Sequence, residues 1–443
     1  MQALFLCFVS LVACFWLGRR SLAQGIVALL AVGYFYGIVR ANLITSFSHF
    51  IFDAGLIGLY AARLFDSSRD KSRDTMLRTW VLVLVGWPML VCLLPFQPLL
   101  VSLVGLRGNI FFLPMLLLAS RLGDRDLIKI ANGISVLNLI ALVFAVAEYF
   151  TSVPQFFPDS PVTSIIYASA DVEGGYFRIP AIFSSAHAYG GAMVLTIPLL
   201  TGAWMRGQTS RLQWLCAAGI GSALLGILMS ATRVNFVLGC AGVLTIFFTS
   251  KMKTGVRVAF VLLIAAIGYS AITNSRFQRF KSLDTDFVTE RIAGSVNRGF
   301  WEILIQYPMG NGLGGGGTSI PYFLQGQVRN PIGLENEYSR ILCEQGIIGL
   351  MLWTAFFGWI VSRWRVALMK TTWQQGRRLA LFMCMVQFAA SMIGTGLLTA
   401  IPATMIFLLN LGWCTTAPQG AADTGESRSS QRAVWARRYG HAY

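Results

Sequence analysis

Three carboxylates and an arginine lie close together in the stretch "ENEYSRILCEQGIIGL", where a long apolar run begins. A helix starting near Asn336 would carry its next charges, Glu337, Arg340 and Glu344, at the spacing i, i+3, i+7. These residues would share one helix face and could form a ladder of ion pairs. Glu335 lies off that face and has no local partner. A carboxylate from which water is partly excluded has a raised pKa and can take a proton from a hydroxyl. We therefore predict Glu335 as a general base, or Glu337 if the ladder is not formed.

Arg233, in "LMSATRVNFVLG", is the single charge between Arg211 and Lys251. It falls at the turn between two apolar runs, on the face opposite the basic loops. An ionisable residue at membrane depth is costly and usually has a partner or a ligand. We favour ligand binding, and the alternative is a guanidinium that extends to the lipid headgroups.

Arg178 and His187 bracket the segment that leads from an outer loop into an apolar run, "RIPAIFSSAH". A histidine near a membrane interface can carry a proton, although hydrogen bonding to the backbone is the commoner role. Both residues are candidates for substrate binding.

The longest segment on that face, residues 274–341, carries six arginines, one lysine and six acids. Arginine binds phosphate oxygens through a planar fork, which lysine lacks. This bias favours a phosphate-bearing ligand, and salt bridges within loop helices are the alternative. The run "GNGLGGGG" matches G-x-G-x-x-G but belongs to no strand–helix unit. We interpret it as backbone that can approach a ligand closely.

These residues are set in a strongly apolar chain. Of its 443 residues, 55% are hydrophobic and 12% are charged, and the mean hydropathy is +0.63. Soluble domains average about 25% charged residues. The net charge of +16 lies mostly in short loops, unlike the clustered basic face of a nucleic-acid-binding protein. The composition predicts an integral membrane protein that contacts membrane lipid and no nucleic acid.

The cysteines and histidines do not follow a metal-binding pattern. The eight cysteines lie in or beside apolar runs, none is in a C-x-x-C pair, and only three histidines occur. We therefore expect no structural zinc, no disulfide framework and no cofactor.

Apolar runs of roughly 17–25 residues, enough to cross the hydrocarbon core, repeat along the chain. They lie near residues 3–17, 24–40, 43–64, 79–97, 102–120, 127–150, 186–204, 212–230, 234–250, 256–273, 342–362, 378–395 and 398–416. These are thirteen runs, and the first is short. We therefore expect an all-α polytopic protein with about 12–13 transmembrane helices. Residues 1–416 are predicted to form a single transmembrane domain.

Basic loops alternate with other loops, which predicts the orientation of the chain. The basic loops, expected in the cytoplasm, are 63–78, 121–129, 206–211, 251–257 and 363–378. The tail 417–443 falls on the same side and is predicted to be disordered, because it has no core to bury. The long segments 151–185 and 274–341 then lie on the outer face, where we expect the chemistry.

Several motifs resemble, in order, those of the O-antigen ligase and polysaccharide polymerase superfamily. "LENEYSRILCEQGIIGL" is similar to the family's H-N-x-Y-L segment followed by an acid and G-I-I-G-L. "SATR" resembles its Ser/Thr–Arg motif, and "FRIPAIFSSAHAYGGAM" fits the loop before the middle spans. "NRGFWEILIQYPMGNGLGGG" is similar to its Arg–aromatic…Pro…G-x-G pattern, with a slightly tighter Arg-to-Trp spacing. The resemblance covers residues 175–362.

The resemblance implies a bacterial inner-membrane protein with a large periplasmic loop that uses glycans carried on undecaprenyl pyrophosphate. Polymerases of this family move the growing chain onto the next lipid-linked repeat unit, and ligases move the finished chain to lipid A–core or protein. Both work without metal. The implied partners are an undecaprenyl-pyrophosphate-linked oligosaccharide and a glycan acceptor, with a chain-length regulator and a flippase as further candidates.

Carried onto this chain, the resemblance implies that Arg233 and Arg298 hold the pyrophosphate during catalysis. Glu335 stands where ligases usually have His, and this difference favours an inverting polymerase with Glu335, or Glu337, as base. The expected substrate-binding residues are Arg178, Arg291, Asn336, Arg340 and His187.

Two alternatives stay open. One is a ligase of the same family. The other is a transporter whose charges line a route, which Glu148 and Asp53 inside apolar runs would favour. Against it, the chain shows no clear internal repeat, and its distinctive charges cluster at one face.

Overall fold

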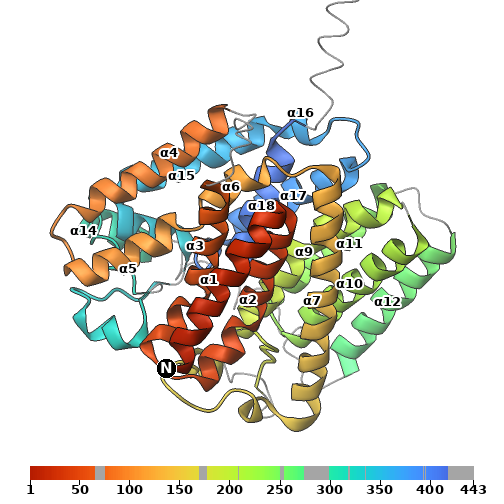
Figure 1. The fold of residues 1–443 in the computed structure, drawn as a ribbon, viewed down its shortest axis with the longest axis horizontal. Coiled ribbons are helices and arrows are strands. Elements are labelled where there is room, and N and C mark those ends of the chain that lie inside the picture. The colour runs from red at the N-terminus through yellow and green to blue at the C-terminus, as the bar shows by residue number, and fades with distance from the viewer. Residues whose placement is uncertain are drawn as a thin grey trace, which may run out of the picture.

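The computed structural model of the chain is built from helices (Figure 1). It describes residues 1–64, 75–168, 177–207, 209–249, 254–273, 299–317, 320–334, 336–392, 394 and 396–417. Within these ranges every regular element is an α-helix or a 3-10 helix (η), and no strand occurs. The predicted all-α class is confirmed.

Most of the helices coincide with the apolar runs of the sequence. In chain order they are α1 (Gln2–Arg20), α2 (Leu22–Asn42), η1 (Ser46–Phe50), α3 (Ile51–Leu64), α4 (Thr75–Cys92), α5 (Leu99–Ile110), α6 (Pro114–Ala119), α7 (Asp124–Thr151), η2 (Val153–Gln155), α8 (Ser164–Tyr167), α9 (Ala186–Arg206), α10 (Ser210–Met229), α11 (Arg233–Thr249), α12 (Thr254–Thr273), α14 (Gly299–Gln306), η5 (Tyr322–Gln327), α15 (Glu337–Ser362), α16 (Trp364–Ala367), α17 (Gln374–Ala390) and α18 (Ala403–Thr415). Each predicted run matches one helix or two consecutive helices.

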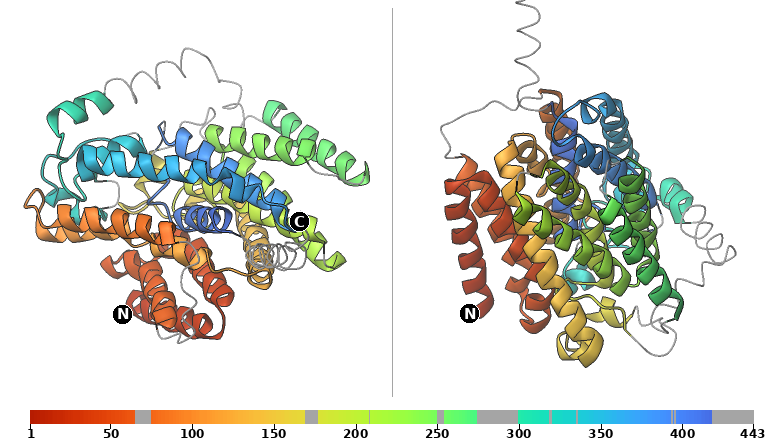
Figure 2. Two further views of the ribbon diagram at one scale, coloured as in Figure 1. Left: turned by 90° about the horizontal axis from the view of Figure 1, so that it is seen from above. Right: turned by 90° about the vertical axis from the view of Figure 1, so that its right-hand side faces the viewer.

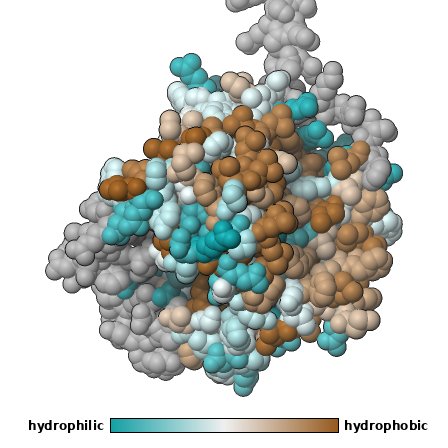
Figure 3. Space-filling model, turned by 90° about the vertical axis from the view of Figure 1, so that its left-hand side faces the viewer, coloured by the Kyte–Doolittle hydropathy of each residue, from teal (hydrophilic) through white to brown (hydrophobic). Residues whose placement is uncertain are grey.

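Eight helical segments in the described ranges are long and apolar enough to cross a membrane. They are Gln2–Arg20, Leu22–Asn42, Thr75–Cys92, Leu99–Ala119, Asp124–Thr151, Ala186–Arg206, Ser210–Met229 and Glu337–Ser362. Large apolar side chains are exposed on them, such as Phe8 (65%) and Leu82 (61%). Hydrophobic residues also cover much of the face seen in Figure 3, around a hydrophilic patch. These features fit a polytopic membrane protein, and the number of about 12–13 spans stays a prediction.

The run over 43–64 is not one continuous helix. Thr45 is extended (φ −138°), and the 3-10 helix η1 precedes the shorter helix α3. Ser48 donates its hydroxyl hydrogen bond to the carbonyl of Thr45 at 2.7 Å. Serine side chains that bond to nearby backbone favour turns over helix, which explains the interruption.

Small residues let the helix backbones approach closely, as is common in membrane bundles. Where α9 crosses α17, a Cβ on Gly202 would lie only 3.2 Å from the Cα of Gly376. α9 packs against α7, α10, α11, α17 and α18. Every residue of α18 is buried. Figure 2 shows the N-terminal helices, in red, gathered on one side and the C-terminal helices, in blue, nearer the middle.

The helices run antiparallel between two ends of the bundle. α2, α7 and α10 finish, and α9 and α11 begin, at one end, which we name the Arg233 end. At the opposite end, Arg206 of α9 forms an ion pair with Asp124 of α7 at 2.7 Å. Residues 152–168, which follow α7, run along the lower edge of Figure 1, at the Arg233 end.

Helix α15 is broken at Gly346, which has a positive φ of 69°. A neighbouring loop replaces the missing helical hydrogen bonds. The backbone N–H of Asn311 donates to the carbonyl of Cys343 at 2.6 Å, and Ile347 donates to the carbonyl of Pro308 at 2.9 Å. Residues 308–311 therefore complete the helix at its break.

The glycine-rich run packs against helices, and no ligand is needed to explain its composition. Gly314 has a φ of 80°, and its backbone lies against Gly105 of α5. A Cβ on Gly310 (φ 87°) would lie 2.8 Å from the backbone nitrogen of Gly346. The close backbone approach that the sequence predicted is thus made to α5 and α15.

Candidate active site

Arg178 and His187 are brought together at the Arg233 end. The Nη1 atom of Arg178 lies 3.2 Å from Nε2 of His187. A guanidinium has only donors, so Nε2 is the acceptor in this hydrogen bond. Arg178 is buried (7% exposed) and His187 is exposed. The pair therefore brings a buried guanidinium and an exposed imidazole together.

Local sequence places His187 in the first turn of α9. Ser185 caps this helix, because its hydroxyl accepts the backbone N–H of Ala188 at 3.1 Å. The N-terminal turn of a helix carries partial positive charge from its unsatisfied N–H groups. His187 thus adds a donor to a turn that already favours an anion.

Arg233 is the first residue of α11. The turn before it contains Ala231 in a left-handed conformation (φ 49°). One turn after His187, Gly190 packs against this turn, since a Cβ there would lie 2.5 Å from Oγ1 of Thr232 and 2.7 Å from Oγ of Ser230. The N-terminal turns of α9 and α11 are therefore neighbours. Because Arg178 lies beside the first of these turns and Arg233 begins the second, this region carries positive charge that suits a phosphate or pyrophosphate, and we name it the cationic site.

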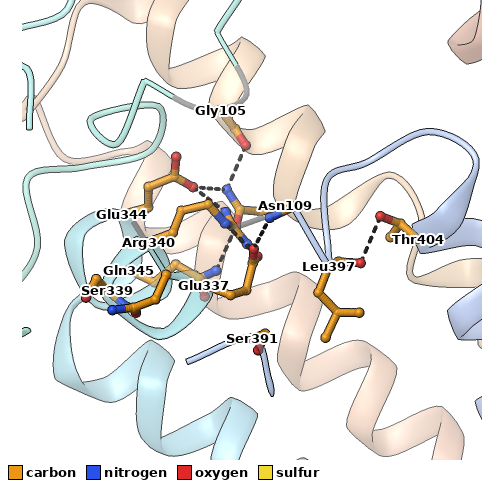
Figure 4. Close-up of polar contacts among 12 residues, drawn as sticks. Gly105, Asn109, Glu337, Ser339, Arg340, Glu344, Gln345, Ser391, Leu397 and Thr404 are labelled. Atoms are coloured by element: carbon orange, nitrogen blue, oxygen red, sulfur yellow. Dashed lines mark hydrogen bonds and ion pairs between the residues drawn. The ribbon is translucent and has the colours of Figure 1, made fainter. Parts of the chain in front are cut away.

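The opening charges of α15 form a buried network (Figure 4). Glu337 receives both Nε and Nη2 of Arg340 on Oε1, each at 2.7 Å. Nη1 of Arg340 donates to Oε2 of Glu344 at 2.8 Å and to Oδ1 of Asn109 at 3.0 Å. Asn109 in turn donates to Oε2 of Glu344 at 2.7 Å. The ladder of ion pairs predicted from the i, i+3, i+7 spacing is confirmed.

Burial restricts what this network can do. The side chains of Glu337 and Glu344 are 0% exposed and that of Arg340 is 1% exposed. The second oxygen of Glu337 accepts the backbone N–H of Gly396 at 2.8 Å. Because both oxygens of Glu337 have donors, it cannot easily take a proton from a substrate. Asn336 caps α15 by accepting the N–H of Ser339 at 2.6 Å.

The structure thus sorts the predicted site residues into two groups. Arg178 and His187 are in contact at the Arg233 end, and Arg233 begins the neighbouring helix α11. Asn336, Glu337 and Arg340 belong to the buried start of α15. The remaining predicted residues, Glu335, Arg291 and Arg298, lie outside the described residues.

The chain before α18 connects the two groups. Gly396 bonds to Glu337, and Pro402 packs on α2, where a Cβ on Gly33 would lie 2.7 Å from Cβ of Pro402. One turn further along α2, Gly37 packs directly on the backbone of Phe183. Phe183 lies between Arg178 and His187 in the chain. A continuous series of packed residues therefore runs from the α15 network to the cationic site.

Sequence reasoning missed several buried polar residues. Asn109 completes the α15 network, and Gln345 donates to its Oδ1 at 2.8 Å. Asp53, which the sequence analysis singled out, forms a partly buried ion pair at 2.7 Å with Arg107, which it did not. Polar residues inside apolar runs were the available signal, but it does not reveal which helices face each other. In the described part of the chain, no three His, Cys, Asp or Glu side chains gather as ligands for a metal ion.

No model of a known protein family matches the chain, and no curated protein matches it significantly.

Proposed function

We propose that the protein is a glycosyltransferase that polymerises undecaprenyl-pyrophosphate-linked repeat units of a surface polysaccharide or O-antigen. It would act at the periplasmic face of a bacterial inner membrane, without metal and with inversion at the anomeric carbon. The observation that carries the proposal is the contact of Arg178 with His187 beside the start of α11, whose first residue is Arg233, at one end of an apolar helical bundle. Such a site suits the pyrophosphate of a lipid whose chain lies in the membrane.

The cationic site would act on the leaving group. Arg178 and Arg233 would bind the pyrophosphate oxygens, and the N–H of His187 would donate a further hydrogen bond. As the bond between the anomeric carbon and the pyrophosphate oxygen breaks, negative charge grows on that oxygen. Preorganised donors stabilise such charge more than they stabilise the substrate. Arg291 and Arg298 are proposed to contribute from the outer loop.

The attacking group would be a sugar hydroxyl of the next lipid-linked repeat unit. Its oxygen forms the new bond to the anomeric carbon as the undecaprenyl pyrophosphate leaves, and its proton passes to a base. We assign this base to Glu335, because the two oxygens of Glu337 are already occupied by Arg340 and Gly396. One displacement of this kind inverts the anomeric configuration.

The test is polymerisation by the purified protein in lipid nanodiscs, supplied with a lipid-linked repeat unit from its host. We expect chains of several units from the wild type, and single units from Arg233→Ala and Glu335→Gln. Arg329→Ala is the matched control, because Arg329 is an exposed arginine whose guanidinium donates to the carbonyl of Pro95. Unchanged single units with the wild type would refute the proposal.

A deletion strain separates polymerase from ligase. Loss of a polymerase leaves surface glycan of a single repeat, whereas loss of a ligase leaves long chains on the lipid carrier. Sizing both the surface and the lipid-linked glycan in the deletion strain distinguishes the two outcomes.

Transport is the second candidate function, and the break in α15 favours it. Discontinuous helices and charges at mid-membrane are features of transporters. This chain has a break at Gly346 within α15 and a partly buried ion pair between Asp53 and Arg107. Movement of a labelled lipid-linked glycan across a vesicle membrane, with no change in its covalent structure, would support transport over polymerisation.

A further inference from the structure

Glu148 is a carboxylate buried near the end of α7, inside a candidate membrane span. Its side chain is 0% exposed, and in the described part of the chain no lysine or arginine forms an ion pair with it. Oε2 accepts the backbone N–H of Ala181 at 3.0 Å, and Oε1 has no partner. An ionisable residue at membrane depth is costly to keep and usually has a function.

The residue that Glu148 holds has an unusual backbone. Ala181 has a φ of 54°, a left-handed conformation that residues with a Cβ seldom adopt. The N–H of Ala181 is buried (0% exposed residue) where no water can replace a lost acceptor. Glu148 therefore stabilises a turn that the chain would not adopt unaided.

The same turn is held by α2 and α9. The backbone N–H of Ile38 donates to the carbonyl of Ile182 at 3.1 Å. The ring of Phe183 stacks on Tyr189 with centroids 5.2 Å apart and lies 5.0 Å from the ring of Tyr34. Glu148 supplies the contact from α7, so three helices determine the course of residues 179–183.

This segment connects the two partners of the cationic site. Arg178 directly precedes it, and His187 follows it in the first turn of α9. The hydrogen bond of 3.2 Å between them depends on how residues 179–183 fold back. Pro180 lies between Arg178 and Ala181 and has a restricted φ. A change in the position of Ala181 therefore also moves Arg178.

We propose that Glu148 is a positioning residue, which through Ala181 holds Arg178 against His187 in the cationic site. The ligand class, a pyrophosphate anion, rests on the proposed function, but the positioning itself does not. Glu148 acts as a hydrogen-bond acceptor for a buried N–H, so an amide in its place retains the effect and an apolar side chain abolishes it.

The test compares Glu148→Leu with Glu148→Gln, whose amide oxygen can still accept the N–H of Ala181. Asn410→Leu is the matched control. Asn410 is fully buried in α18, and its side chain likewise makes one hydrogen bond to backbone, to the carbonyl of Leu195 at 2.7 Å. Both leucine variants lose one buried polar contact, but only one of the two contacts leads to Arg178.

Two measurements are made on the full-length protein in nanodiscs. The first is the rate at which diethyl pyrocarbonate modifies His187, followed by mass spectrometry, because the contact with Arg178 protects Nε2. The second is the affinity for inorganic pyrophosphate. For Glu148→Leu we expect faster modification and an affinity lower by about tenfold or more, the effect of losing one charged hydrogen-bond donor. Glu148→Gln and Asn410→Leu should match the wild type in both measurements.

The outcomes separate this inference from the proposed function. If Glu148→Leu lowers the unfolding temperature as Asn410→Leu does, yet leaves the modification rate of His187 unchanged, Glu148 has only a structural role and the inference is wrong. Equal effects of Glu148→Gln and Glu148→Leu would overturn it too, because they would show that the acceptor is irrelevant. If the modification rate responds as expected but the wild type does not bind pyrophosphate, the positioning stands and the proposed function fails.

Discussion

The buried network at the start of α15 makes a quantitative prediction for Arg340→Met. Arg340 is the only cation among two carboxylates, all three side chains being 0–1% exposed. Its removal deletes the contacts of 2.7, 2.8 and 3.0 Å to Glu337, Glu344 and Asn109. Breaking a buried ion pair from one side costs about 3–5 kcal/mol, because the remaining charge stays buried without compensation. We expect a loss of stability in this range.

The assay is the free energy of unfolding in mixed micelles titrated with sodium dodecyl sulfate. The triple variant Glu337→Leu, Arg340→Met, Glu344→Leu replaces the whole network by apolar groups and should recover most of the loss, to within about 1–2 kcal/mol of the wild type. Arg329→Ala, at an exposed site, should change stability by less than about 1 kcal/mol. A loss below about 1 kcal/mol for Arg340→Met would show that water reaches the network and would refute the reasoning.

Three further predictions concern single residues. Asn109→Ala should lower the free energy of unfolding by about 1–3 kcal/mol, because it leaves buried hydrogen-bonding groups of the α15 network unsatisfied; the same titration measures this. Gly37→Ala should abolish recovery of monodisperse protein in size-exclusion chromatography, since a Cβ there overlaps the backbone of Phe183, whereas Gly191→Ala, with open space around it, should not. Arg233→Ala should slow chain elongation by about 10²–10³-fold in the nanodisc assay, the effect of losing one donor to a developing charge. The elongation rate of Arg233→Lys should lie between those of the wild type and Arg233→Ala.

The helices of this fold are predictable from the sequence because membrane spans leave a local signal. A run of apolar residues long enough to cross the bilayer identifies a helix without knowledge of its neighbours. The break at Gly346 leaves no such signal, because the predicted apolar run over 342–362 continues through it. Its hydrogen bonds come from residues 308–311, and only the folded chain shows which loop lies there.

The same distinction applies to the site. The pairing of Arg340 with Glu337 and Glu344 follows from spacing within one helix. Its pairing with Asn109 joins positions 231 residues apart, which spacing cannot reveal. Arg178 and His187 could be suggested as neighbours from their positions at the two ends of one short segment. That the start of α11, with Arg233, lies beside them depends on how α9 packs against the turn before α11.

The break in α15 gives the loop before that helix a role inside it. At Gly346 the carbonyl of Cys343 and the N–H of Ile347 have no helical partners, and Asn311 and Pro308 supply them. In hydrocarbon, such groups would be costly to leave without partners. Residues 308–311 thus take the place of one turn of α15, although they belong to another part of the chain. Shortening this loop would unwind a membrane span, so the loop's length is constrained by the helix and not only by the ligand.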